Sequence, residues 1–129
     1  MSTTTTAAAP GEGELVIVLC TFPNADDAGQ AAQILVGEDL CACVNILRDV
    51  RSIYRWNGQV VNGGEVLCLI KTQKARHAEM LTRLTELHPY EVPELVTLNP
   101  SHVNEPYLRW VLTETDPSRP PRPPTADGG

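Results

Sequence analysis

The sequence predicts an α+β protein with the ferredoxin-like order of elements: strand, helix, strand, strand, helix, strand, and then a short closing helix. Two observations predict this order. Short apolar runs typical of strands alternate with segments whose apolar residues recur at the helical period. Asn57-Gly58 joins two extended segments and is the strongest short signal for a tight β-hairpin. In such a fold both main helices cover one face of a mostly antiparallel sheet, and the other face is left bare.

The first half of the chain supplies a strand, a helix and a long extended segment. Residues 15–20 form a continuous apolar run, which is typical of a strand buried on both faces. Asn24 is positioned to cap a helix. The core-facing stripe of that helix has small side chains at helical spacing: Ala28, Ala31, Ala32 and Leu35. Residues 40–56 should then be extended, with a break near residues 48 and 49.

The second half repeats the pattern after the hairpin turn. Residues 65–72 are predicted to form a buried strand, and residues 75–87 a helix. That helix must end at His88, because Pro89 disfavours the helical conformation of the residue before it. A short strand is expected at residues 95–98. The closing helix should begin after Asn104, with an apolar face made of Tyr107, Trp110 and Val111.

Only the middle of the 129-residue chain has the composition of a folded domain. Residues 2–13 contain no bulky apolar side chain, and residues 116–129 contain five prolines and two glycines. Such segments cannot bury enough apolar surface to offset the loss of chain entropy. We therefore expect a disordered N-terminal tail at residues 1–13, one domain at residues 14–115 and a disordered Pro-rich tail at residues 116–129.

Charge and composition exclude several classes of protein. The net charge of −6 disfavours nucleic-acid binding, which requires a basic surface. The N-terminus has neither the basic nor the apolar region of a secretory signal, and no apolar run approaches the length of a membrane span. We expect a cytoplasmic protein with neither nucleic-acid nor membrane partners. Its four cysteines lie in predicted strands, without a C-x-x-C pair, and are expected to be buried, reduced thiols.

The predicted sheet is apolar on both sides, although only one side has helices to cover it. A bare apolar face is most simply covered by further copies of the same chain. Tyr54 and Trp56 lie near the tip of a long hairpin and would also need a second surface. The sequence therefore predicts self-association.

Several motifs, in order over about residues 14–115, resemble the CutA divalent-cation tolerance family. They are Leu40-Cys41-Ala42-Cys43-Val44-Asn45, Ser52-Ile53-Tyr54-Arg55-Trp56 with Gly58, Glu65 to Lys71-Thr72, His88-Pro89-Tyr90-Glu91-Val92-Pro93-Glu94, and Tyr107-Leu108-x-Trp110. The resemblance implies a tight homotrimer similar to PII signalling proteins, with hairpins that exchange edges between subunits. It also implies association with copper and other divalent metal ions, and no established catalytic activity.

The resemblance implies a metal site at Cys20 and His88. These positions match the cysteine that ends the first strand and a histidine beside the proline-tyrosine pair, which copper-binding members are thought to use. A second histidine of some members is replaced by Leu87 here, so one ligand fewer is available. The residues themselves leave alternatives open: Cys20 as a buried structural thiol and His88 as a histidine that ends a helix.

A second candidate set combines polar and aromatic side chains at strand ends: Lys71, Glu65, Glu94, Trp56 and Tyr90. If these ends meet at a subunit cleft, they form a ligand pocket with an aromatic wall. The alternative is an interfacial ion pair with trimer packing. The pocket would make the protein a PII-like sensor of a small anionic ligand, by analogy of fold alone. An enzyme that uses Cys20 or Lys71 is disfavoured, because the sequence shows no triad arrangement.

Overall fold

The computed structural model describes residues 14–120 and 122. Its elements follow the predicted order: β2 (Leu15–Phe22), α1 (Ala25–Gly37), β3 (Cys43–Trp56), β4 (Gln59–Gln73), α2 (Lys74–Leu87), β5 (Val96–Leu98) and α3 (Glu105–Glu114). The strands form one antiparallel sheet in the order β3-β4-β2-β5. The α+β, ferredoxin-like prediction is confirmed. The predicted N-terminal tail, and the predicted C-terminal tail at 121 and 123–129, lie outside the described residues.

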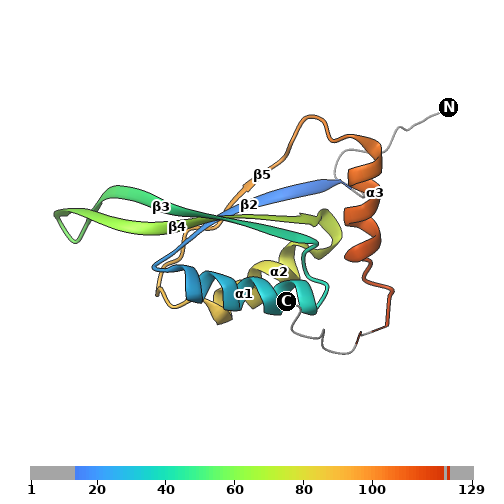
Figure 1. The fold of residues 1–129 in the computed structure, drawn as a ribbon, viewed down its shortest axis with the longest axis horizontal. Helices are drawn as coiled ribbons and strands as arrows, with labels where there is room; N and C mark the ends of the chain where they lie inside the picture. Colours follow the sequence, from blue (N-terminus) through green and yellow to red (C-terminus); the bar gives the residue numbers. More distant parts are fainter. Residues whose placement is uncertain (1–13, 121, 123–129) are drawn as a thin grey trace.

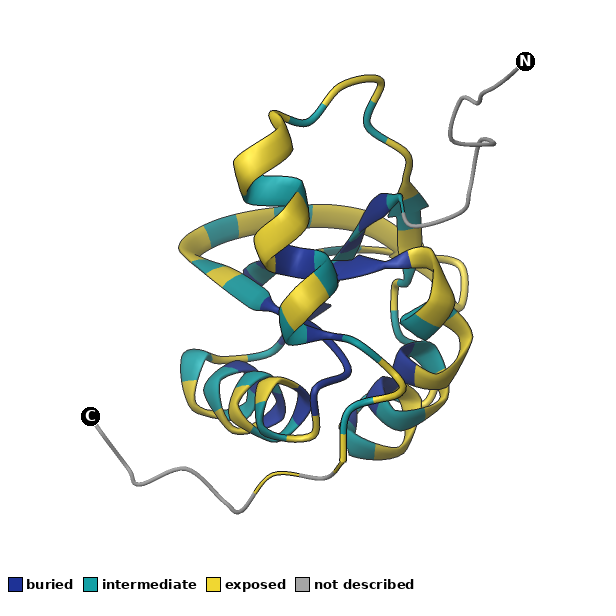
Figure 2. Ribbon diagram, turned by 90° about the vertical axis from the view of Figure 1, so that its right-hand side faces the viewer, coloured by how far each residue is buried: buried dark blue, intermediate teal, exposed yellow. Residues whose placement is uncertain are grey.

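Two helices cover one face of the sheet, and the third crosses one end of it. Figure 1 shows α1 and α2 side by side below the strands, α3 upright at one end, and the β3–β4 hairpin projecting from the other. The buried residues gather between the sheet and the two lower helices (Figure 2). The molecule therefore has a compact body and one long two-stranded arm.

The main core lies between β2, β4 and the two lower helices. From β2 it takes alternate residues, Val18, Cys20 and Phe22, because successive side chains of a strand point to opposite faces. From α1 it takes Ala28, Ala31 and Leu35, and the two small alanines let the helix approach the sheet closely. From α2 it takes Met80 and Leu84, both fully buried. A fully buried side chain of this size contributes about 1.5–3 kcal/mol relative to an exposed one.

The connection from α1 to β3 differs from the prediction. Residues 40–42 were expected to begin an extended segment, but they belong to the turn, and β3 begins at Cys43. Asp39 has a positive φ of 61°, and the Leu40 amide donates to the Leu35 carbonyl at 2.9 Å, so the chain reverses here. Cys41 is therefore buried in a connection and not in a strand, while the predicted break in the segment is a bulge between Leu47 and Val50.

The closing helix packs against the sheet differently from the prediction. Val111 is fully buried beside Leu15 and Ala42, with Tyr107 packed against them. Trp110, expected on the same apolar face, is 43% exposed. Leu108 occupies the contact instead. Because Leu15 and Ile17 point away from α1 and α2, α3 covers one end of the face that the other two helices leave bare.

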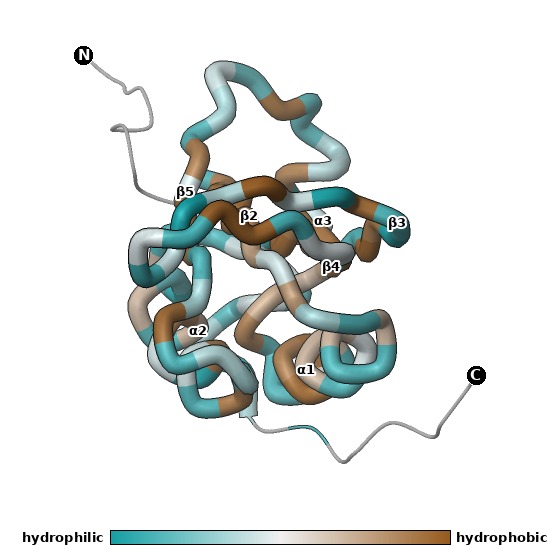
Figure 3. The backbone as a smooth tube through the Cα atoms, turned by 90° about the vertical axis from the view of Figure 1, so that its left-hand side faces the viewer, coloured by the Kyte–Doolittle hydropathy of each residue, from teal (hydrophilic) through white to brown (hydrophobic). Residues whose placement is uncertain are grey.

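Much of the rest of that face is apolar and uncovered in the single chain, and we call this apolar part the open face; Asn45 and Lys71 lie beside it. Its residues are cross-strand neighbours by register: Leu19, Leu47, Leu67, Leu69, Val96 and Leu98. Leu47, Val96 and Leu98 are 43%, 46% and 44% exposed. In Figure 3 brown, hydrophobic segments recur between teal ones in the strands above the helices. No helix of the described residues is long and apolar enough to cross a membrane.

Candidate functional site

His88 fixes the point where α2 ends. Its backbone is extended, with φ −81° and ψ 137°, as the following proline requires. The Tyr90 amide donates to Nδ1 of His88 at 3.0 Å, so Nδ1 carries a lone pair and the proton is on Nε2. Nε2 then donates to the Thr21 carbonyl oxygen at 2.8 Å. The ring also stacks on Phe22, with centroids 4.3 Å apart. His88 thus joins α2, β2 and the loop that follows.

Cys20 lies close to the same carbonyl oxygen. Its Sγ makes a long contact with the Thr21 oxygen at 3.8 Å, and the residue is completely buried. Burial is the main cause that raises the pKa of the Cys20 thiol to about 12, and Cys68, Glu94 and Glu65 add to it. Cys68 is its direct partner across β2 and β4. At neutral pH the Cys20 thiol is therefore protonated.

The two predicted metal ligands are brought together, but their donor atoms are engaged. Sulfur and imidazole nitrogen are donors that copper accepts. Here the Cys20 thiol is protonated, and both ring nitrogens of His88 already take part in hydrogen bonds. In residues 14–120 and 122, no group of three or more His, Cys, Asp and Glu residues is arranged to hold a metal. The pair matches copper in chemistry without forming a ready-made site.

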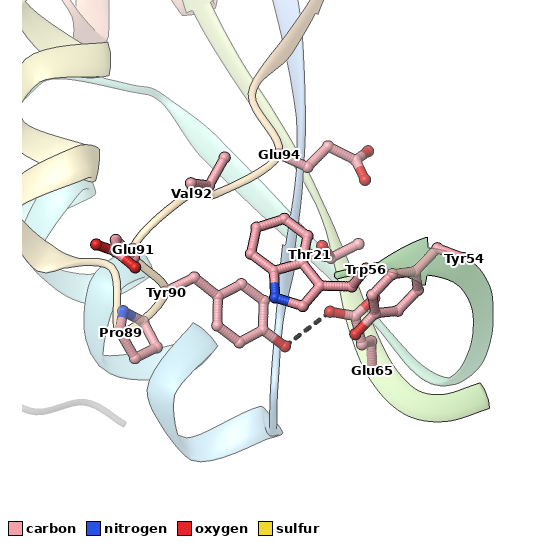
Figure 4. A pocket seen from close by; sticks show the side chains of 9 residues that line it. All are labelled: Thr21, Tyr54, Trp56, Glu65, Pro89, Tyr90, Glu91, Val92 and Glu94. Carbon is pink, nitrogen blue, oxygen red and sulfur yellow. Dashed lines mark hydrogen bonds between the residues drawn. The ribbon is translucent and has the colours of Figure 1, made fainter. Parts of the chain in front are cut away.

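A cleft opens where the hairpin leaves the body, beside the loop after α2. Its volume is about 460 Å³, within the range of small-molecule sites. Figure 4 shows side chains from the hairpin, from the end of β2 and from the loop around it. They are Thr21, Tyr54, Trp56, Glu65, Pro89, Tyr90, Glu91, Val92 and Glu94. We call this the hairpin cleft.

One hydrogen bond ties the loop to the hairpin at the cleft. The Tyr90 hydroxyl donates to a Glu65 carboxylate oxygen at 2.7 Å, drawn as a dashed line in Figure 4. Burial and then the neighbouring Glu65 carboxylate raise the pKa of Tyr90 well above its usual range, so the phenol stays a donor at any physiological pH. The Tyr90 ring also lies against His88, with centroids 5.0 Å apart. The cleft and the Cys20–His88 pair are therefore neighbours.

The predicted ligand set divides between two places. Trp56, Tyr90 and Glu94 line the hairpin cleft together with Glu65. Lys71 lies farther along β4, opposite Ile17 and Cys43, and its ammonium donates to the Asn45 side chain. Among the described residues that line the cleft, none is Lys, Arg or His. The cleft is thus acidic and aromatic.

Sequence reasoning did not assign Thr21 or Tyr54 to a site. The Thr21 contribution is a backbone oxygen, which any residue type supplies, so no sequence signal identifies it. The period of two places Tyr54 on the same side of β3 as Trp56. That signal could have added Tyr54 to the aromatic wall.

Fold and site together define a small α+β protein with a bare apolar sheet face, a projecting hairpin and a buried thiol beside a histidine. The family model described as "CutA1 divalent ion tolerance protein" matches residues 16–114. Accordingly, the chain belongs to the CutA1 divalent ion tolerance protein family.

Curated relatives agree with this assignment. The divalent-cation tolerance protein CutA of Thermus thermophilus is 43% identical over 77% of this chain and 96% of its own length. That of Pyrococcus horikoshii is 39% identical over 78% of this chain and 98% of its own length. The human Protein CutA is 37% identical over 83% of this chain and 59% of its own length.

Solved structures show the same fold. The CutA crystal structure from Xylella fastidiosa superposes with a TM-score of 0.78 at 36% identity, covering 80% of this chain and 99% of that one. The Cut A1 structure from Thermus thermophilus has a TM-score of 0.76 at 42% identity, covering 78% and 98%.

Proposed function

We propose that this protein is a homotrimeric, non-catalytic divalent-cation tolerance protein of the cytoplasm, with copper or another divalent heavy metal as its inorganic ligand at Cys20 and His88. The metal site is proposed because Sγ of Cys20 and Nε2 of His88 both contact the Thr21 carbonyl oxygen. The family description supplies the class of ligand. The open face supports the assembly.

The geometry also sets the cost of binding a metal. Cys20 must release a proton from a thiol whose pKa is about 12. His88 must give up its hydrogen bond to Thr21, or the one from Tyr90. Metal binding is therefore coupled to proton release. We expect weak binding at neutral pH, which strengthens about tenfold for each unit of pH while one thiol proton is released.

The same chemistry supports a role without catalysis. A thiol with a raised pKa and no exposure to solvent has almost no thiolate with which to attack a substrate. We expect the four free cysteines to stay reduced in the proposed cytoplasmic location. The acidic lining of the hairpin cleft does not favour the anionic-ligand sensor, because its predicted cation, Lys71, lies elsewhere.

Metal binding is tested by copper titration of the full chain purified without chelator or affinity tag. The wild type should bind, and the Cys20→Ala and His88→Ala variants should each weaken binding at least about tenfold, as expected for loss of one ligand. Cys43→Ala is the matched control, because Cys43 lies in β3 outside the core cluster. Equal signals from the wild type and a Cys20→Ala, His88→Ala double variant would exclude this site.

A further inference from the structure

The chain continues past α3 and turns back beneath this helix toward the end of α1 (Figure 1). We propose that residues 115–120 and 122 form a strap, latched by Arg122 on Asp39, that closes a cavity at the Cys41 thiol. This goes beyond the proposed function, because it concerns neither the proposed metal ligands nor the assembly.

The strap is anchored where it leaves α3. Thr115 is completely buried; its hydroxyl accepts from the Gln73 side chain at 2.8 Å, and its carbonyl oxygen accepts from Nε of Arg76 at 3.0 Å. The Asp116 carboxylate then accepts from the amide and the hydroxyl of Ser118, at 2.9 and 2.8 Å, which turns the chain. The strap is therefore fixed to β4 and α2 before it reaches α1.

Arg122, at the far end of the strap, meets a buried carboxylate. Its Nε donates to the two oxygens of Asp39 at 3.1 and 3.3 Å, and its Nη2 donates to the Glu114 carbonyl oxygen at 3.2 Å. The Asp39 side chain is 8% exposed. A buried carboxylate is costly unless donors satisfy its oxygens, so losing Arg122 costs more than losing one partner of an exposed ion pair.

The end of α1 needs positive charge that the helix itself does not supply. The last carbonyl groups of a helix carry partial negative charge. The last turn of α1 has no basic residue, and Glu38 and Asp39 add two carboxylates directly after it. Arg83 of α2 pairs with Glu38 at 2.9 Å, and Arg122 of the strap pairs with Asp39. The strap thus completes the charge balance of this turn.

A cavity of about 290 Å³ lies at the latch. Cys41, Asp39 and Arg122 line it together. Cys41 belongs to the main core on the helix side of the sheet, away from the open face. All the latch contacts lie within one chain, so they do not depend on how copies assemble. Because Arg122 forms part of the lining, its release opens the cavity to reagents that reach Cys41.

The test measures alkylation of individual thiols in the full-length protein. Iodoacetamide is added at pH 8 in a Cys43→Ala background, so that Cys41 has no second thiol beside it, and peptide mass spectrometry follows Cys41 and Cys68. Cys68 is the internal reference, because both thiols are 1% exposed and Cys68 does not line the cavity. Opening of the strap exposes Cys41 alone, whereas global unfolding exposes both thiols.

Arg122→Gln should raise the alkylation rate of Cys41 about threefold or more, while the rate of Cys68 changes by less than about twofold. Asp39→Asn should have the same effect. Asp39 has a positive φ of 61°, which asparagine also tolerates, so this variant removes the charge without changing the turn. The double variant should exceed either single variant by less than about twofold, because both substitutions break the same latch.

Arg109→Gln is the matched control. It removes the same charge from an exposed ion pair with Glu105 on α3, and the alkylation rate of Cys41 should not change. Three results would overturn the proposal: an unchanged Cys41 rate in Arg122→Gln, an equal rise for Cys41 and Cys68, or an equal rise in Arg109→Gln. Copper titration does not depend on these residues, so the two proposals fail separately.

Discussion

Single side chains join three elements at the end of α2. The His88 ring connects this helix end to the Thr21 carbonyl on β2, and Tyr90 connects the next residues to Glu65 on β4. Each bond links residues far apart in sequence, so each one fixes a tertiary contact. A net contribution of about 1 kcal/mol per bond is typical, and loss of one partner costs more when the other stays buried.

Three buried thiols should make stability sensitive to alkaline pH. Burial raises the pKa of Cys20 and Cys41 to about 12 and that of Cys68 to about 11, from 9.0. Between about pH 9 and 11 the unfolded chain loses thiol protons that the folded chain retains. The free energy of unfolding is therefore highest below pH 9. It falls as the pH rises above 9, by about 1.4 kcal/mol per pH unit for each thiol.

Urea unfolding from pH 7.5 to 10.5 measures this effect. Above pH 9 the free energy of unfolding should fall less steeply with pH in Cys68→Ala, by the contribution of one thiol. Cys43→Ala, on the outer strand β3, is the control. A stability that stays level across this range would contradict the burial of the thiols.

At the scale of elements, glycine is favourable in the hairpin turn and unfavourable inside α1. Gly58 has a φ of +78°, a conformation that side chains rarely adopt, whereas Gly29 lies inside α1 with nothing within 4 Å of an added Cβ. Gly58→Ala should destabilise the fold by about 1 kcal/mol. Gly29→Ala should stabilise it by about 0.5–1 kcal/mol, because alanine favours the helix. Chemical denaturation of both variants measures the contrast, and equal shifts of the same sign would refute it.

The elements were predictable because their signals are local. Asn24 caps α1 as expected, since its side chain accepts from the Asp27 amide at 2.8 Å, and Pro89 ends α2 where predicted. Errors occurred where long-range packing decides. Residues 40–42 belong to the turn that follows α1, where the Leu40 amide bonds to the Leu35 carbonyl. Trp110 is exposed because Leu108 packs against the sheet instead.

The site was only partly predictable. The sequence predicts that Trp56, Tyr90 and Glu94 belong to one site, and these three residues meet in the hairpin cleft. Lys71 was grouped with them because it was placed at a strand end, but β4 runs on to Gln73, and the hairpin carries the aromatic residues away from it. Which strand end meets which loop depends on the register and the bulge of β3, and neither follows from local sequence.

At the scale of the whole molecule, two apolar surfaces lie uncovered in the single chain. The open face carries leucine and valine side chains of all four strands, and the hairpin exposes Ile53, Tyr54, Trp56 and Val60. Patches of this kind in a folded protein mark interaction sites. Copies of the same chain would bury both surfaces at once, which stabilises the assembly in proportion to the apolar area removed from water.

Trp56 should contribute to this assembly. Trp56→Ala removes a large aromatic side chain from the hairpin, and the dissociation constant of the trimer should rise at least about tenfold, as expected for an interface anchor. Trp110→Ala is the matched control, since the two tryptophans are 50% and 43% exposed in the single chain. Sedimentation velocity over a dilution series compares them, and equal effects would place Trp56 outside the interface.

Light scattering coupled to size exclusion, at micromolar concentration, tests the self-association of the apolar sheet most directly. The chain mass is 14.1 kDa, so a homotrimer gives about 42 kDa across the whole elution peak. A uniform mass of 14.1 kDa at the same concentration would contradict it, because the open face would then be stable in water.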